Sequence, residues 1–326
     1  MPVSKPAPVQ EIAIPAGSIL STAVPVSLLR EQHVKLCVYG RNRSGKTTLA
    51  AQFKKPLLLI SCEPDENGGA TSVADMDGVA LIRVSHRMLG QDSAGRWVNA
   101  DNPACVRRDT VKGSAKVVTI ANELAVHNPF KTVCLDTVTS LQDIILVELQ
   151  NLPKIPEMMS WGIPNDNLYK NRAERLRETV RRLLELNNCN VIVNAQEKDH
   201  NGPKDDFGGK AKILHTLQQG SFMAPALGAT NAQWLQDNCG YVVQIYEDEV
   251  METVMVPCHN PDGSPAPPVP TKVGTGKRQR HLRLVYHANF AAGGRWKYNP
   301  NMPEFVTAPT PKELYEAMAA YVPALK

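Results

Sequence analysis

The sequence predicts an α/β fold with a mainly parallel sheet, helices on both faces of that sheet, and antiparallel strands toward the C-terminus. Short apolar runs without polar alternation indicate strands that are covered on both faces, as in parallel sheets. Helical patterns lie between these runs, and the alternation of strand and helix is typical of an α/β core. After Gly240 the hydrophobic period changes to two, which favours antiparallel strands.

The expected elements begin after an N-terminal arm. Residues 1–30 contain five prolines and are expected to be extended, either without fixed structure or paired with a neighbouring subunit. One α/β domain is expected over residues 31–305, with an insertion at about 86–112. Its parallel strands are expected at residues 34–39, 57–60, 79–84, 132–135 and 191–193. Helices are expected at residues 46–54 and 167–187, and the second combines an apolar face with five arginines.

The C-terminal part is expected to contain β-strands, one loop and one helix. Antiparallel strands are expected at residues 241–246, 253–256 and 281–285. A proline-rich stretch at about 259–276 is expected to form a long loop. Residues 306–326 are expected to contain a closing helix, because the sequence from Thr310 to Glu313 has capping-box spacing with proline at the first helical position.

Composition excludes several classes of protein. The chain has 326 residues, of which 43% are hydrophobic and 21% charged, and this is ordinary globular usage. No apolar run approaches the roughly 20 residues of a membrane helix, so no membrane partner is expected. The seven cysteines contain no Cys-x-x-Cys pair, which favours reduced thiols over disulfides or a zinc site. The first ten residues lack the apolar block of a secretory signal, and a cytoplasmic location is expected.

The strongest motif is a phosphate-binding loop that matches G-x-x-x-x-G-K-[ST]. It consists of Gly40, Arg41, Asn42, Arg43, Ser44, Gly45, Lys46, Thr47 and Thr48. The glycines let the backbone curl so that several N–H groups face a phosphate. Lys46 is expected to reach the β- and γ-phosphates, and Thr47 to offer its hydroxyl to Mg²⁺. The sequence therefore predicts a site for ATP with Mg²⁺.

Acidic and polar residues follow the neighbouring strands. Asp136 ends the run at residues 132–135 and is expected either to anchor Mg²⁺ or to cap the next helix, and the phosphate loop favours the metal role. Glu63 follows the run at residues 57–60 and is predicted to be the general base that polarises water, with Asp65 and Glu66 as competitors. No N-K-x-D motif is present, so guanine specificity is not expected.

The strand at residues 190–194 leads to Gln196. This glutamine either senses the γ-phosphate and passes its state to the following loop, or is an ordinary turn residue.

The order of these motifs resembles the ATPase core of the RecA/RadA recombinases over about residues 33–300. More narrowly, the chain is similar to phage-encoded RecA-like ATP-binding proteins, some of which are ATP-dependent single-strand annealing proteins. The resemblance is carried by Lys131–Asp136, Ser160-Trp161-Gly162, the arginine-rich helix, Asn190–Val193 and Pro225–Gly228. It implies a RecA-like P-loop NTPase fold in which Glu63 activates water and Gln196 links ATP to a DNA-contacting loop.

The resemblance also implies partners. Loops at about residues 151–169 and 197–219 would hold single-stranded DNA, and the second loop contains Lys198, Lys204, Lys210 and Lys212. Residues 263–303 contain seven basic residues and no acid, which indicates either a polyanion partner or a solvated strand face. Within this segment, Arg295 or Lys297 is predicted to reach the γ-phosphate held by a neighbouring subunit.

The expected function is ATP hydrolysis, stimulated by DNA, in an oligomeric ring or filament that serves phage recombination or single-strand annealing in the bacterial cytoplasm. A single-strand-binding protein is a further expected partner. One alternative is a P-loop kinase that phosphorylates a nucleotide or small molecule, with Arg107-Arg108 as its candidate lid. Another is a scaffold that binds ATP without hydrolysing it.

Overall fold

A computed structural model of the chain describes residues 33–63, 69–150, 166–199, 223–227, 229–259, 264–285, 292–294, 302–308, 310–322 and 325. The chain divides into two units, Met1–Gln32 and His33–Lys326. All described residues belong to the second unit. The predicted N-terminal arm, residues 1–30, lies outside them.

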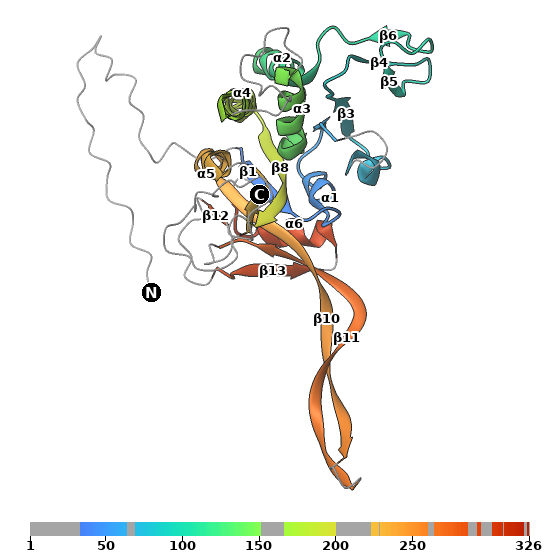
Figure 1. The fold of residues 1–326 in the computed structure, drawn as a ribbon, viewed down its shortest axis with the longest axis vertical. Helices are drawn as coiled ribbons and strands as arrows, with labels where there is room; N and C mark the ends of the chain where they lie inside the picture. Colours follow the sequence, from blue (N-terminus) through green and yellow to red (C-terminus); the bar gives the residue numbers. More distant parts are fainter. Residues whose placement is uncertain are drawn as a thin grey trace, which may run out of the picture. The chain divides into compact units, whose positions relative to one another are not determined.

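One mixed sheet forms the centre of this unit (Figure 1). Its strands are β1 (Lys35–Gly40), β2 (Leu57–Ser61), β3 (Val79–Arg83), β7 (Thr132–Asp136), β8 (Asn190–Asp199), β9 (Met223–Pro225), β10 (Tyr241–His259), β11 (Pro265–Arg283), β12 (Gly293–Gly294) and β13 (Phe305–Ala308). Their order is β13-β11-β10-β1-β8-β7-β2-β3, with β9 paired to β8 and β12 paired to β10.

The central strands are parallel, and β8 separates the end of β1 from the end of β7. β8 pairs in parallel with both β1 and β7, so it lies between the strand that enters the phosphate loop and the strand that ends at Asp136. β2, which lies between them in sequence, pairs with β7 and β3 on the other side. β1, β2 and β7 are almost wholly buried, as their continuous apolar sequences predict.

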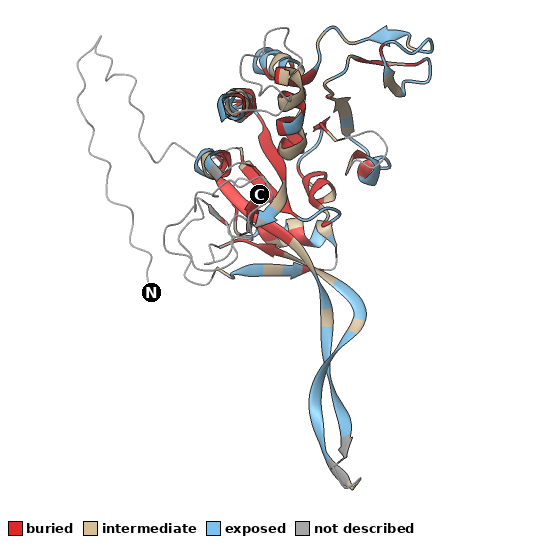
Figure 2. Cartoon of the chain, viewed as in Figure 1, coloured by how far each residue is buried: buried red, intermediate tan, exposed pale blue. Residues whose placement is uncertain are grey.

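Helices cover both faces of the sheet. They are α1 (Lys46–Ala50), α2 (Gly113–Val126), α3 (Val138–Gln150), α4 (Asp166–Leu184), α5 (Ala229–Asn238) and α6 (Pro311–Ala319), with a 3₁₀ helix η3 at Gly69–Val73. Alternate residues of β2 enter different cores: Leu58 and Ile60 pack with α2, α3, α4 and α5, whereas Leu57 and Leu59 pack with α1, η3 and α6. Figure 2 shows both buried layers in red. The predicted fold class is therefore confirmed.

Helix α1 is shorter than predicted, whereas α6 begins at the predicted capping box. α1 ends at Ala50, four residues before the predicted end, because the chain closes into short-range bonds from Gln52 to Leu49 and from Phe53 to Ala50. α6 has the complete capping box at Thr310. α6 packs in the same core cluster as α1, and Tyr315 meets Phe53 edge to face at 4.9 Å between ring centroids.

Among the described helices, none combines the length and hydropathy that crossing a membrane requires.

The predicted loop at about residues 259–276 is wrong from Pro265 onward. These residues belong to β11, which pairs antiparallel with β10 in a long two-stranded ribbon (Figure 1). The ribbon accepts prolines because β11 pairs with β13 only over Arg280–Arg283, and the rest of its outer edge needs no backbone N–H partner. A register shift between Val256 and Cys258 accommodates the densest prolines.

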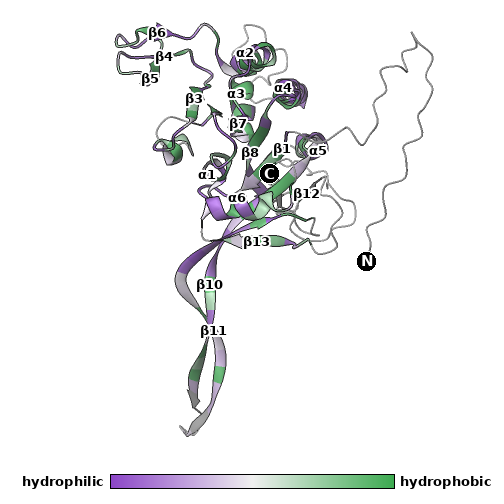
Figure 3. Ribbon diagram, turned by 180° about the vertical axis from the view of Figure 1, so that it is seen from behind, coloured by the Kyte–Doolittle hydropathy of each residue, from purple (hydrophilic) through white to green (hydrophobic). Residues whose placement is uncertain are grey.

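The expectation of purely antiparallel pairing after Gly240 also needs correction. Residues Leu36–Tyr39 of β1 pair in parallel with Tyr241–Gln244, and only from Gln244 onward does β10 pair antiparallel with β11. The buried start of β10 therefore completes the parallel core, while its far part contains exposed apolar residues such as Val254. In Figure 3 hydrophobic stretches of the β10–β11 ribbon are coloured green.

The insertion predicted at about 86–112 contains a second, three-stranded sheet. Its strands are β4 (Leu89–Gln91), β5 (Trp97–Asn99) and β6 (Arg107–Arg108), in the order β5-β4-β6 and all antiparallel. Asp92 stabilises the β4–β5 turn, because its carboxylate accepts the backbone N–H groups of Ala94 and Arg96.

Candidate active site

The phosphate loop joins β1 to α1 along a path that depends on its glycines. Gly45 has a φ of 97°, and Arg43 adopts a left-handed φ of 64°. A side chain at Gly40 would place its Cβ 2.1 Å from the carbonyl oxygen of Ile245 on β10. Glycine at position 40 therefore allows the loop to lie directly against the neighbouring strand.

Lys46 lies inside this loop. Its Nζ donates to the carbonyl oxygens of Gly40 at 3.0 Å and Arg41 at 2.8 Å. Burial lowers the pKa of Lys46, while the nearby carboxylates of Asp136 and Glu63 act in the opposite direction. The buried Ser44 Oγ has no hydrogen-bond partner among the described residues. A buried lysine and an unsatisfied hydroxyl in one loop are a suitable environment for phosphate oxygens.

Thr47 and Asp136 meet at the carboxyl ends of the strands. Thr47 Oγ1 donates to Asp136 Oδ2 at 2.8 Å, and Asn194 Nδ2 on β8 donates to Asp136 Oδ1 at 3.0 Å. Asp136 is 1% exposed. Burial raises the pKa of its carboxyl, and the hydrogen bonds from Asn194 and Thr47 partly offset that effect.

This oxygen pair suits Mg²⁺. Magnesium is usually held by one or two protein oxygens, with phosphates and waters completing its octahedral shell. The Thr47 hydroxyl and the Asp136 carboxylate supply two hard oxygens on the same side of the phosphate loop. Gly69 lies directly against these two oxygens, because a Cβ at position 69 would be 2.2 Å from Thr47 Oγ1 and 2.9 Å from Asp136 Oδ2. The residues present therefore fit the ion that the loop implies.

Glu63 follows β2 and faces the same space. Its Oε2 accepts the backbone N–H of Gly69 at 2.7 Å, and this bond orients the carboxylate. β2 neighbours β7 in parallel, with Ser61 opposite Asp136, so Glu63 and Asp136 follow adjacent strand ends. The competing acids Asp65 and Glu66 lie outside the described residues.

Gln196 lies on β8, one strand from the phosphate loop. Gly40 is its register partner on β1, and its backbone N–H donates to Thr139 Oγ1 at 3.1 Å. β8 does not end at Asn194 as predicted, but continues to Asp199. Gln196 is therefore part of the strand, not a turn residue.

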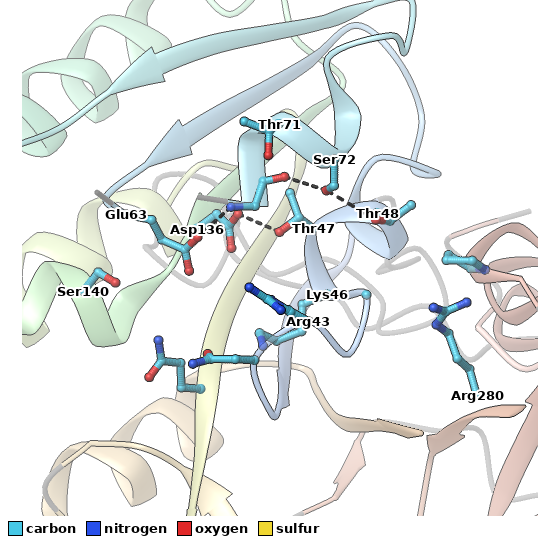
Figure 4. A pocket seen from close by; sticks show the side chains of 15 residues that line it. Arg43, Lys46, Thr47, Thr48, Glu63, Thr71, Ser72, Asp136, Ser140 and Arg280 are labelled. Atoms are coloured by element: carbon cyan, nitrogen blue, oxygen red, sulfur yellow. Dashed lines mark hydrogen bonds between the residues drawn. The ribbon is translucent and has the colours of Figure 1, made fainter. Parts of the chain in front are cut away.

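These side chains surround one pocket of about 900 Å³ (Figure 4). The loop residues that line it are Asn42, Arg43, Gly45, Lys46, Thr47 and Thr48. Glu63, Asp136 and Gln196 line it as well. Figure 4 shows Glu63 and Ser140 on one side of Lys46 and Arg280 on the other. The pocket thus has an acidic end beside the metal ligands and a basic end beside β11.

Sequence reasoning missed three contributors to this site. Asn194 could have been noticed, because it is a polar residue next to a buried apolar run. Arg280 was predicted only as one member of a basic segment, and Pro311 only as a helix-start residue. Both line the pocket because β11 and α6 fold back beside the phosphate loop. No local pattern in the sequence encodes that approach.

Several predicted functional residues lie outside the described residues. They are Arg295 and Lys297, and the DNA-loop lysines Lys204, Lys210 and Lys212. Lys198 is described and lies exposed on β8, where its register partner is Ala224 on β9. The candidate lid residues Arg107 and Arg108 are exposed on β6 and do not line the pocket.

Part of the basic segment at residues 263–303 is neutralised by acids outside it. Arg278 and Arg280 both form ion pairs with Glu247 on β10, at 3.4 and 3.1 Å. Arg283 forms an ion pair with Glu304 at 2.6 Å. The segment is therefore a weaker attractor of polyanions than its sequence charge indicates.

The sequence profile of a family described as an AAA domain matches residues 32–296. Among solved structures, the chain is similar to a KaiC-like protein from the hyperthermophilic archaeon Pyrococcus horikoshii OT3. That similarity has 11% sequence identity and a TM-score of 0.37, and it covers 84% of this chain and 89% of the other. No curated protein matches the chain significantly.

Proposed function

Because this chain belongs to the AAA domain family of P-loop ATPases, we propose that it hydrolyses Mg-ATP and couples hydrolysis to single-stranded DNA as an oligomer. The biological setting that we propose is phage recombination or single-strand annealing. The observation that carries the proposal is the placement of Glu63 and Gln196 in the same pocket as Lys46, Thr47 and Asp136. A phosphate loop alone would support binding, whereas the added carboxylate and amide support turnover and signalling.

Each residue has a chemical task in this reaction. Lys46 and the loop N–H groups bind the phosphates, and Thr47 and Asp136 would hold Mg²⁺. When bound, Mg²⁺ would supply positive charge that stabilises the transferred phosphoryl group. Glu63, oriented by the Gly69 N–H, would accept a proton from the attacking water. Most of the rate enhancement would come from positioning and electrostatics.

The coupling to DNA is proposed to run along β8. Gln196 lines the pocket, and the next residue, Glu197, accepts a hydrogen bond from Gln244 on β10 at 3.2 Å. Lys198 then follows at the exposed end of the strand. A change in the contacts of Gln196 with the γ-phosphate would thus be transmitted over two residues to the DNA-facing lysines. Lys204, Lys210 and Lys212 are proposed to extend that surface.

Oligomerisation is proposed to complete the site. A cation from a neighbouring subunit, Arg295 or Lys297, would stabilise charge on the γ-phosphate and make hydrolysis depend on assembly.

The test is phosphate release from Mg-ATP with and without single-stranded DNA. We expect DNA to stimulate release in the wild type, and Lys46→Ala to abolish turnover in both conditions. Lys198→Ala should lower the stimulation while the DNA-free rate stays unchanged. Lys54→Ala is the matched control, since Lys54 is exposed but does not line the pocket. Unchanged turnover in Lys46→Ala would refute the ATPase, and a DNA-independent rate would refute the coupling.

A second cavity gives the kinase alternative a specific basis. It has a volume of about 540 Å³ and shares Glu63 and Ser140 with the nucleotide pocket. Arg83, His86 and Arg87 lie on its wall. An acceptor held there would lie beside the γ-phosphate, where Glu63 could take its proton. Product analysis separates the two functions, because a kinase yields a phosphorylated acceptor in place of free phosphate, and an ATP-gated scaffold yields neither.

A further inference from the structure

Arg280 belongs to β11 but reaches the nucleotide pocket. In the sheet it is the register partner of Glu247 on β10 and of Ala308 on β13. Its side chain lines the pocket together with the phosphate loop. Its Nε lies 3.5 Å from the position that a Cβ on Gly45 would occupy. The guanidinium therefore lies close to the phosphate loop at Gly45.

Glu247 fixes the direction of Arg280. Arg280 Nη2 lies 3.1 Å from Glu247 Oε1, and the two side chains are 30% and 20% exposed. A guanidinium has five N–H donors in one plane, so one arginine can bind a carboxylate on one edge and an anion on another. Arg278 also pairs with Glu247, but it is 75% exposed and does not line the pocket.

The orientation of the nucleotide follows from the two ends of the pocket. The γ-phosphate must lie beside Thr47, Asp136 and Glu63, because those residues supply the metal ligands and the candidate base. Arg280 lies on the opposite side of Lys46 (Figure 4). The α-phosphate and ribose must then extend toward Arg280.

We propose that Arg280 binds the nucleotide at its α-phosphate, and that this contact ties nucleotide occupancy to the root of the β10–β11 ribbon. The proposal rests on the nucleotide site of the proposed function. It adds a cation that acts within the same chain, at the end of the nucleotide away from the γ-phosphate. Glu247 is the positioning residue for this contact.

The backbone hydrogen bonds at the root of the β10–β11 ribbon should become more stable when Arg280 holds a nucleotide. Among the described residues, β11 is flanked on both sides at its root alone, where Arg280–Arg283 pair with β13 while also pairing with β10. Beyond that point the described parts of the two strands pair with each other, and an isolated two-stranded ribbon is marginally stable. A ligand that holds Arg280 should therefore slow the opening of backbone hydrogen bonds at the root.

The experiment measures ADP affinity and amide hydrogen exchange on the full chain. ADP lacks the γ-phosphate, so its affinity does not depend on contacts at the γ end. We expect Arg280→Ala to weaken ADP binding about tenfold, the loss of one charge-assisted contact. Arg278→Ala, the matched control, should stay within about twofold. ADP should slow exchange at residues 277–283 in the wild type and in Arg278→Ala, but not in Arg280→Ala.

Two further variants keep the test decisive. Arg280→Lys retains the charge but not the planar fork, and it should fold and bind ADP with intermediate affinity. Glu247→Gln should weaken ADP binding less than Arg280→Ala, because it disturbs only the direction of the guanidinium. Wild-type ADP affinity in both Arg280 variants would overturn the inference. If Lys46→Ala also bound ADP normally, the nucleotide site itself would be wrong.

Discussion

Asp136→Asn should separate the stability of this protein from its activity. The asparagine has the shape of the aspartate, and both existing hydrogen bonds can survive the exchange. Its oxygen can accept from Asn194 Nδ2, and its amide can donate to Thr47 Oγ1, whose hydroxyl can reverse its role. The substitution removes a negative charge from a side chain that is 1% exposed. We therefore expect the ligand-free fold to be at least as stable as the wild type.

Asp136→Ala supplies the contrast from which a magnitude follows. It leaves the fully buried Asn194 amide without its acceptor, and an unsatisfied buried group costs about 1–3 kcal/mol. With an unfolding entropy of about 2.1 cal/mol/K per residue, one kcal/mol lowers Tm by roughly 1.6 °C in a unit that spans His33–Lys326. A loss of about 2 kcal/mol therefore corresponds to a fall of roughly 3 °C. Asp136→Asn should show no such fall.

Activity, in contrast to stability, should fall in both variants. Both variants lose a charged Mg²⁺ ligand, which contributes several kcal/mol to stabilisation of the transition state, so ATP hydrolysis should fall by at least about 100-fold. The assays are ligand-free thermal unfolding and steady-state phosphate release at saturating Mg-ATP. The reasoning is refuted if Asp136→Asn loses as much Tm as Asp136→Ala, or if it keeps Mg²⁺-dependent turnover.

The pH dependence of this pair gives an independent check. Burial raises the pKa of Asp136 above its unfolded value. A carboxyl with a raised folded pKa contributes stability below the unfolded pKa, and that contribution is lost as pH rises through the folded pKa. The Tm of Asp136→Asn should therefore approach that of the wild type in acid and exceed it increasingly toward neutral pH. A gap that narrows as pH rises would contradict this sign.

Two other substitutions test the base and the fold. Glu63→Gln should lower the rate constant of hydrolysis in single-turnover assays by about 10²–10⁴ with ATP affinity retained, and an unchanged rate constant would exclude Glu63 as the base. Gly113→Ala should destabilise the fold by about 1–2 kcal/mol, because Gly113 has a left-handed φ of 58°. Its Cβ would also displace the Glu148 carboxylate, whose Oε1 would lie 1.4 Å away and which accepts hydrogen bonds from Ser114. Its KM for ATP should not change, since Gly113 does not line the pocket, and unfolding with a wild-type Tm would contradict the steric argument.

Features that depend on neighbours along the chain could be predicted from the amino-acid sequence alone. The phosphate loop is contiguous from Gly40 to Thr48, so its glycines and its lysine could be identified together. The buried parallel strands were visible as apolar runs, because both of their faces are covered. The capping box at Thr310 was likewise visible, since capping uses residues only three positions apart. Glu63 and Asp136 were predicted because strand ends on one edge of a parallel sheet share a site.

Contacts between distant segments became visible in the three-dimensional fold and could not be predicted from local patterns. The Asn194–Asp136 bond exists because β8 lies between β1 and β7, and no local pattern specifies that order. The proline-rich stretch becomes a strand because β10 supplies its pairing partner, which outweighs the local preference of proline for loops. Arg280 enters the pocket because β11 passes beside the phosphate loop. Strand order and ribbon pairing depend on contacts between segments far apart in the chain, whereas motifs and periodicity depend on a few consecutive residues.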